Sequence, residues 1–84
     1  MTMRVLYFAW MRERVGAASE EIDPGPARTP RELVARLAEE DERYAHAFAD
    51  LSAVRVAIDQ DMADLDAPIG DARELAFFPP VTGG

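Results

Sequence analysis

One segment near the middle of the chain carries clear helix signals and therefore constrains what its flanks can form. Thr29 can cap a helix through its hydroxyl, Pro30 fits the first turn, and Glu32 completes the pattern of a capping box. Four apolar residues then recur at helical spacing on one face, namely Leu33, Val34, Leu37 and Ala38. The acidic residues at 39–42 are unfavourable at a helix C-terminus, so we expect the helix to end near them. A helix with one apolar face needs a second layer to pack on.

The segments on either side show strand patterns that can supply this layer. We expect strands at residues 4–9, 19–23, 53–58, 62–65 and 74–78. In the first of them, Arg4 marks the face toward solvent or a partner, which leaves Val5 and Tyr7 for the core. Two shorter helices are expected, one at 10–15 and one capped by Asp41. This order of elements indicates an α+β domain with one sheet packed on one main helix.

Size and charge restrict the function classes. The chain has 84 residues, enough for one domain but with little room to enclose a substrate, so a self-sufficient active site is not expected. Its 16 acidic and 9 basic residues give a net charge of −7. Nucleic acid is not expected as a partner, because phosphate backbones are bound by clustered basic side chains. An acidic surface instead suits docking on a basic protein.

The sequence offers no recognisable catalytic or metal-binding constellation. There is no Cys, and His46 is the only histidine, so we expect His46 at the surface rather than in a catalytic site. The acidic runs at 39–42 and 59–66 lack the pattern of a calcium loop and are interpreted as solvated faces. The apolar run at 5–11 is too short for a membrane span and is not followed by a cleavage site. We therefore expect a cytoplasmic protein with no membrane association and no bound metal.

A different kind of signal closes the chain, which ends Pro79-Pro80-Val81-Thr82-Gly83-Gly84. Two terminal glycines would arise by chance in about 1 in 200 chains at average glycine usage. The prolines stiffen the exit from the last strand, and the glycines leave a backbone slender enough to enter a narrow channel. We expect a domain at residues 1–78 and a flexible tail at 79–84, with a free and reactive carboxylate on Gly84.

Three stretches of the sequence together form a recognisable pattern. They are Val-Leu-Tyr-Phe-Ala at 5–9, Arg-Glu-Arg-Val-Gly at 12–16, and Glu-Leu-Ala-Phe-Phe-Pro-Pro-Val-Thr-Gly-Gly at 74–84. The pattern resembles the small subunits of molybdopterin synthase, which are ubiquitin-like sulfur carriers, and the similarity covers nearly the whole chain. Two turns depart from that family. Asp59 stands where Asn is usual, and Asp-Ala-Arg at 71–73 stands where Asp-Gly-Asp is common.

The resemblance implies a β-grasp (ubiquitin-like) fold with a mixed sheet and a role as a sulfur carrier. It implies that an ATP-dependent activating enzyme adenylates the carboxylate of Gly84 and that sulfur then replaces the adenylate to give a thiocarboxylate. The tail would donate this sulfur to cyclic pyranopterin monophosphate in the large synthase subunit, forming the molybdopterin dithiolene. The chain would not be catalytic alone and would bind no cofactor itself. A two-plus-two heterotetramer with the large subunit is also implied by the resemblance.

The same resemblance assigns roles to the tail and to a docking face. The tail residues are Gly84 and Gly83 at the reactive end, guided by Pro80, Val81 and Thr82. If Leu75 and Phe77 face the helix, alternation turns Phe78 outward, where it can act as an interface anchor. Phe8 and Met62 are predicted as companions of Phe78 at the partner interface.

Three other functions stay open at this point. A related carrier could serve thiazole or cysteine synthesis instead of pterin synthesis. A ubiquitin-like modifier would be joined through Gly84 to lysines of target proteins, and a plain binding module would have an inert tail. The Phe-Phe-Pro-Pro-Val-Thr run at 77–82 favours the pterin branch.

Overall fold

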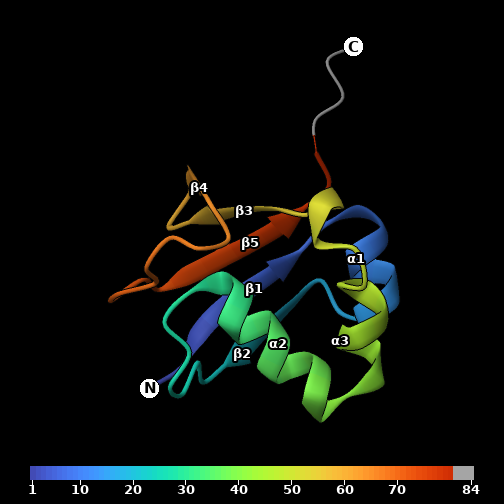
Figure 1. The fold of residues 1–84 in the computed structure, drawn as a ribbon, viewed down its shortest axis with the longest axis horizontal. Helices are drawn as coiled ribbons and strands as arrows, with labels where there is room; N and C mark the ends of the chain where they lie inside the picture. Colours follow the sequence, from blue (N-terminus) through green and yellow to red (C-terminus); the bar gives the residue numbers. More distant parts are fainter. Residues whose placement is uncertain (81–84) are drawn as a thin grey trace.

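One mixed sheet is built from five short strands, β1 (Met3–Tyr7), β2 (Ser19–Ile22), β3 (Arg55–Ile58), β4 (Asp61–Ala63) and β5 (Glu74–Phe78). The computed structural model describes residues 1–80. The strand order is β2-β1-β5-β3-β4, which places β5 in the middle (Figure 1). β1 and β5 run parallel, whereas the other three neighbouring pairs are antiparallel. The predicted α+β class and mixed five-stranded sheet are confirmed.

The helical layer covers one face of this sheet. It consists of α1 (Ala9–Val15), α2 (Pro30–Glu40), α3 (Glu42–Ala47) and the short 3-10 turn η1 (Leu51–Ala53). In Figure 1, α2 and α3 lie in front of the strands. The Thr29 hydroxyl oxygen accepts a hydrogen bond from the backbone N–H of Glu32 at 3.1 Å, so the predicted cap of α2 is confirmed. The Glu32 carboxylate accepts from the backbone N–H of Arg28 at 3.0 Å, one residue before the position that a capping box requires.

Local chemistry also ends α1 and starts α3. Gly16 adopts the left-handed conformation, with φ of 90°, and its N–H donates to the carbonyl of Arg12 at 2.9 Å. The Asp41 carboxylate accepts from the backbone N–H of Arg43 at 2.9 Å and thereby caps α3 as predicted. The end of α1 at Gly16 and the start of α3 after Asp41 keep both helices short, and α1 and α3 pack together.

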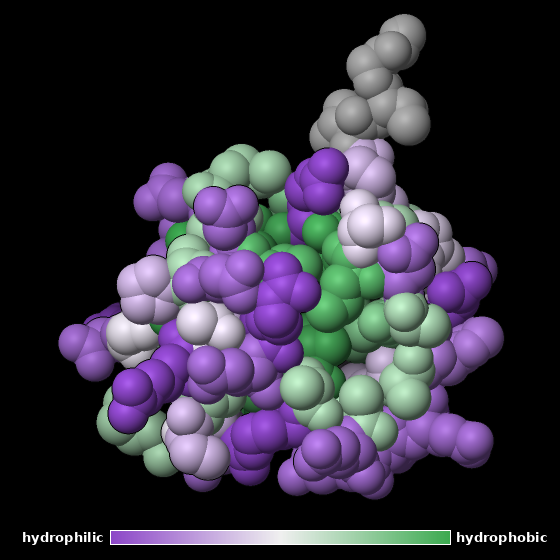
Figure 2. Space-filling view, viewed as in Figure 1, coloured by the Kyte–Doolittle hydropathy of each residue, from purple (hydrophilic) through white to green (hydrophobic). Residues whose placement is uncertain are grey.

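The core lies between the sheet and the helices. Val5 and Tyr7 of β1 and Leu75 and Phe77 of β5 are all buried there, as the alternation predicted. The ring of Phe48 meets that of Phe77 edge-on, with 5.0 Å between their centroids. On the helix side the buried residues are Met11, Val15, Leu33, Val34, Leu37, Tyr44 and Ala47. Figure 2 shows a strip of hydrophobic residues in the middle of this side of the molecule, with hydrophilic residues around it.

Several boundaries differ from the predictions by a few residues. α1 begins at Ala9 rather than at residue 10, and Ala9 has a φ of 54°, because the chain must turn sharply from β1 into the helix. The predicted strand at 53–58 starts only at Arg55, since η1 takes up residues 51–53. β4 ends at Ala63 because the next residues bend away, and the carbonyl of Leu65 accepts from the N–H of Arg31 at 2.9 Å. Sequence periodicity does not reveal such contacts between distant segments.

Within residues 1–80, none of the helices is both long enough and apolar enough to cross a membrane.

Candidate functional site

The sheet face turned away from α2 and α3, here called the outer face, carries an apolar row across four strands. Cross-strand register places Leu6 of β1 beside Ala76 of β5, Ala76 beside Ala57 of β3, and Ala57 beside Met62 of β4. Each of the two alanines is 8% exposed, so the middle of the row offers little accessible side-chain surface. The sequence predicted only Met62 of these residues. Leu6 and the alanines could have been found by extending the period-two pattern across all the strands.

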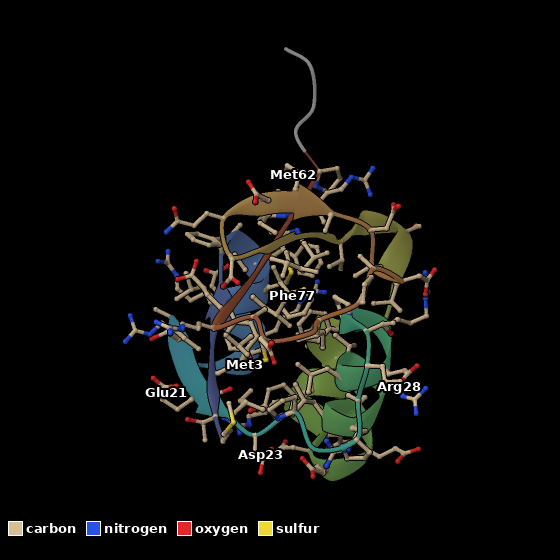
Figure 3. The ribbon with its side chains drawn as sticks, turned by 90° about the vertical axis from the view of Figure 1, so that its left-hand side faces the viewer. Met3, Glu21, Asp23, Arg28, Met62 and Phe77 are labelled. Atoms are coloured by element: carbon tan, nitrogen blue, oxygen red, sulfur yellow. The ribbon has the colours of Figure 1, made fainter. Side chains whose placement is uncertain are left out.

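Phe8, Met62 and Phe78 were predicted at a partner interface. Strand alternation puts their side chains on the outer face, and their role at an interface stays a prediction. Phe8 is 46% exposed and Met62 is 66% exposed, and both border the apolar row of this face. Phe78 points to the same face but is half-buried rather than exposed, because β5 is the central strand and has neighbours on both sides. In Figure 3, Met62 lies at the outer surface of the hairpin, whereas Phe77 lies in the interior.

Charge is distributed unevenly along the outer face. At the end where β5 begins, Arg4 pairs with Glu21 at 3.8 Å and lies beside Glu74 in the register. At the end where β5 finishes, Arg55 is the residue opposite Phe78. The outer face therefore changes from charged, at the start of β5, to mainly apolar, at the end of β5. Such a patch with a polar rim is typical of a protein-docking surface.

The predicted tail starts at this apolar end. β5 finishes at Phe78, and Pro79 and Pro80 follow it as half-buried residues. The end of β5 is fixed by a hydrogen bond in which the N–H of Phe8 donates to the carbonyl of Phe77 at 3.1 Å. Four predicted site residues lie outside the described part of the chain, namely Val81, Thr82, Gly83 and Gly84. Their assigned roles stay predictions.

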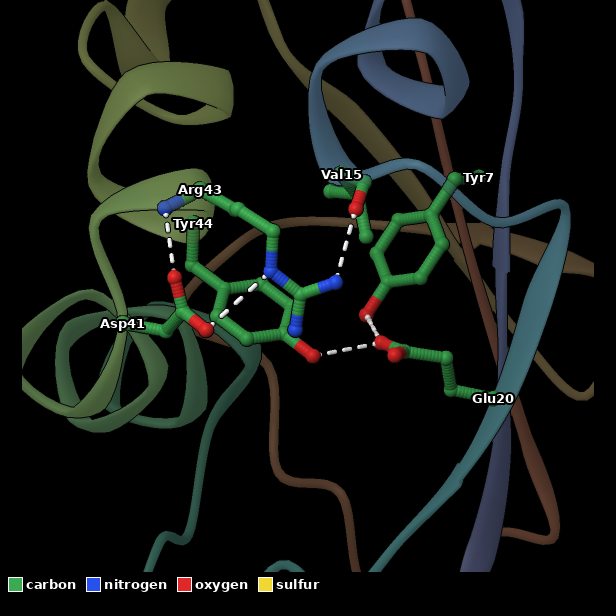
Figure 4. Close-up of polar contacts among 6 residues, drawn as sticks. All are labelled: Tyr7, Val15, Glu20, Asp41, Arg43 and Tyr44. Atoms are coloured by element: carbon green, nitrogen blue, oxygen red, sulfur yellow. Dashed lines mark hydrogen bonds and ion pairs between the residues drawn. The ribbon is translucent and has the colours of Figure 1, made fainter.

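A polar cluster on the inner side of the sheet was missed by the sequence analysis (Figure 4). Glu20 of β2 accepts hydrogen bonds through one carboxylate oxygen from the hydroxyls of Tyr7, at 3.0 Å, and Tyr44, at 2.6 Å. Burial and the nearby Glu20 charge raise the pKa of Tyr7, and raise the pKa of Tyr44 to about 12. Both hydroxyls therefore stay protonated as donors. The sequence did contain a signal for this cluster, because strand alternation places Glu20 on the same, inner side of the sheet as Ile22.

This cluster joins elements rather than forming a reactive site. The Arg43 guanidinium lies 5.3 Å from the centre of the Tyr44 ring and donates to the carbonyl of Val15 at 3.0 Å. The cluster thus ties α1, α3, β1 and β2 together, and it leaves no free base next to a nucleophile.

The remaining candidates for chemistry are dispersed. His46 is exposed on α3, as predicted. Within residues 1–80, no group of three or more His, Asp or Glu side chains is placed to hold a metal ion. The described residues thus present an apolar outer face that leads to the start of the predicted tail.

Comparison with known proteins gives this arrangement a family. The model of the ThiS family matches residues 5–84, which includes the apolar row of the outer face and the whole tail. The chain belongs to the ThiS family. Two curated relatives of this ThiS-family chain are molybdopterin synthase sulfur carrier subunits. The one from Escherichia coli (strain K12) is 38% identical over 82 residues, covering 98% of this chain and 99% of the relative. The one from Haemophilus influenzae (strain Rd) is 38% identical over 84 residues, with the same coverage.

Solved structures show the same fold. A putative molybdopterin converting factor subunit 1 from Pyrococcus furiosus matches this ThiS-family chain with a TM-score of 0.71 and 27% identity, covering 96% of this chain and 99% of the other. The complex of subunits 1 and 2 of molybdopterin-converting factor from Helicobacter pylori matches over the full length of both chains, with a TM-score of 0.63 and 26% identity. SAMP1 from Haloferax volcanii also matches over the full length of both chains, with a TM-score of 0.71. Its 22% identity supports the ubiquitin-like β-grasp fold alone.

Proposed function

We propose that this ThiS-family chain is the sulfur carrier subunit of a molybdopterin synthase. The observation that carries the proposal is the 38% identity to curated sulfur carrier subunits over 98% of the chain. The described structure agrees with this role, because it has a docking face that leads to the start of the tail. The closing residues Gly83 and Gly84 supply the kind of slender end that the role requires.

The proposed chemistry takes place at the carboxylate of Gly84. The carboxylate attacks the α-phosphorus of ATP and releases pyrophosphate, which gives an acyl adenylate. A sulfur nucleophile supplied by the activating system then displaces AMP, and the product is a thiocarboxylate. The first step is needed because a free carboxylate is a poor acyl donor, whereas the mixed anhydride has a good leaving group. Each thiocarboxylate delivers one sulfur to cyclic pyranopterin monophosphate, and water returns its acyl group to the Gly84 carboxylate. Two loaded carriers are therefore consumed for each molybdopterin dithiolene.

The carrier needs two partners in this scheme. An ATP-dependent activating enzyme carries out the adenylation, so the chain itself binds no cofactor, and a large synthase subunit receives the tail. The solved complex of subunits 1 and 2 from Helicobacter pylori supports a partner of the second kind. We place Phe8, Met62 and Phe78 at the interface with the large subunit and propose a two-plus-two assembly. Because the activation step uses ATP, we propose a cytoplasmic location.

The composition of the chain suits a carrier of an activated acyl group. The sequence contains no lysine and no cysteine, so neither an amine nor a thiol side chain of its own can attack the activated Gly84. General acid–base work is left to the partners, since the described residues hold no paired catalytic groups.

The proposal is tested by measuring the intact mass of the protein after incubation with a competent activating enzyme, ATP and a sulfur donor. We expect a gain equal to the replacement of one oxygen by sulfur, which is absent without ATP and absent when Gly84 is deleted. Addition of the large subunit and the cyclic pterin should then return the mass to its starting value. No gain in the complete reaction, or an isopeptide bond from Gly84 to other proteins, would contradict the proposed function.

A further inference from the structure

Arg55 is the cation nearest in the register to the point where the tail begins. It lies directly opposite Phe78 across the β3–β5 pair, and Pro79 follows Phe78 in sequence. Residues on this side of the sheet alternate with the buried Val54 and Val56, so the Arg55 side chain belongs to the outer face and is exposed there. A guanidinium thus stands at the apolar end of the docking face.

The guanidinium of Arg55 has no ionic partner among residues 1–80. Its hydrogen bond to the carbonyl of Val54 is 3.5 Å long, at the limit for such a bond. Three other arginines are paired with a carboxylate, Arg4, Arg31 and Arg43. Among the arginines without such a partner in residues 1–80, Arg55 is the one that lies opposite the last residue of β5, next to the start of the tail. On a protein with a net charge of −7, an exposed arginine without a carboxylate partner beside an apolar patch is available to an outside group.

We propose that Arg55 pairs with a carboxylate of the large synthase subunit beside the opening that receives the tail. This inference rests on the proposed function. The overall charge of the carrier favours a basic partner and speeds encounter, but it does not fix orientation. At Arg55 the charge pattern is opposite to that of the rest of the interface, with a cation on the carrier and a carboxylate on the large subunit. This single pair therefore fixes how the two proteins are oriented on each other. Arginine suits this role because its planar fork can bind a carboxylate through two hydrogen bonds.

The test compares two charge reversals that change the net charge equally. Arg55→Glu removes the proposed contact, and Arg28→Glu is the matched control, because Arg28 is also exposed but lies on the helix side of the molecule (Figure 3). The affinity of each folded variant for the purified large subunit is measured by calorimetry, with thermal unfolding as the check on folding. We expect Arg55→Glu to raise the Kd at least about tenfold more than Arg28→Glu. Arg55→Lys should recover part of the affinity.

The outcomes separate this proposal from the function on which it rests. Equal Kd values for Arg55→Glu and Arg28→Glu would overturn the role of Arg55. So would normal binding by Arg55→Glu together with lost thiocarboxylate formation, because the cation would then serve the activating enzyme. Restored binding of Arg55→Glu to a large subunit in which one Asp or Glu is changed to Arg would identify the partner group. If the unchanged chain gains no sulfur and binds no large subunit, the proposed function itself fails.

Discussion

Asp59 and Glu74 exchange hydrogen bonds where the β3–β4 turn meets the start of β5. The backbone N–H of Asp59 donates to the carbonyl of Glu74 at 2.9 Å, and the Asp59 carboxylate accepts from the N–H of Glu74 at 3.0 Å. The same carboxylate oxygen accepts from the N–H of Arg73 at 2.9 Å. Asp59 and Gln60 have φ angles of 49° and 73°, as a tight hairpin turn requires. An asparagine could accept both bonds through its amide oxygen, so Asp59 fits a turn where the resembling family usually has Asn.

Replacing Asp59 tests this contact directly. We expect Asp59→Ala to lower the free energy of unfolding by about 1–1.5 kcal/mol, because two exposed backbone N–H groups exchange their carboxylate acceptor for water. Asp59→Asn keeps the acceptor and should stay within about 0.5 kcal/mol of the unchanged chain. Urea denaturation followed by circular dichroism measures both values. An alanine variant as stable as the asparagine variant would show that the side chain is not needed.

Alkaline pH should destabilise the fold through the two tyrosines, which are the only ones in the chain. Their pKa values in the folded state lie above the ordinary 10.0, to about 12 for Tyr44, so the folded state holds these protons more tightly than the unfolded state does. The stability they contribute is complete below pH 10 and is lost as the pH rises through about 12. Tyrosinate absorbance titration, with parallel denaturation, measures this loss.

Glu20→Gln provides the control for the alkaline transition. It removes the negative charge beside both hydroxyls while keeping an acceptor oxygen, so the pKa of each tyrosine should fall toward 10.0. The absorbance change should then begin at a lower pH than in the unchanged chain. Superimposable titration curves for the two proteins would rule out Glu20 as a cause of the raised pKa values.

Met62 should contribute to docking without contributing to the fold. It is 66% exposed at the end of the apolar row, so we expect Met62→Glu to change the unfolding free energy by less than about 0.5 kcal/mol. A charge buried at an interface is costly, so the same change should weaken binding to the large subunit by about tenfold or more. Glu13→Gln, an exposed change on α1, serves as the control. Unchanged binding by Met62→Glu would remove Met62 from the interface.

The cap of α2 should have a measurable effect on stability. Thr29→Ala removes the acceptor for the N–H of Glu32 and should lower the free energy of unfolding by about 1 kcal/mol. Thr2→Ala, at an exposed residue before β1, makes the same chemical change without loss of a cap. The two variants are compared by thermal unfolding, and equal melting temperatures would argue against the cap.

Local signals in the sequence were sufficient for much of the fold. Thr29 and Pro30 mark the start of α2, Gly16 marks the end of α1, and alternation in 74–78 identifies the buried side of β5. Each of these signals lies within a few residues of the structure it specifies, so no knowledge of tertiary contacts is needed.

Features that depend on contacts between distant segments could not be predicted from the sequence in the same way. The half-burial of Phe78 follows from the central place of β5, and its Arg55 neighbour comes from a strand more than twenty residues earlier in the chain. The hydrogen bonds from Tyr7 and Tyr44 to Glu20 join three separate elements, and no periodicity within one segment predicts them. The left-handed conformation of Ala9 likewise contradicts its intrinsic preference and is imposed by the surrounding packing.

The central, parallel placement of β5 beside β1 has a mechanical consequence. A force that pulls on the chain beyond Phe78 acts along β5. The hydrogen bonds of β5 with β1 on one side and with β3 on the other then bear the load together, in shear. A terminal strand at the border of the sheet would instead peel away one bond at a time. The domain should therefore resist a load applied beyond Phe78 better than a domain whose last strand lies at the border of its sheet.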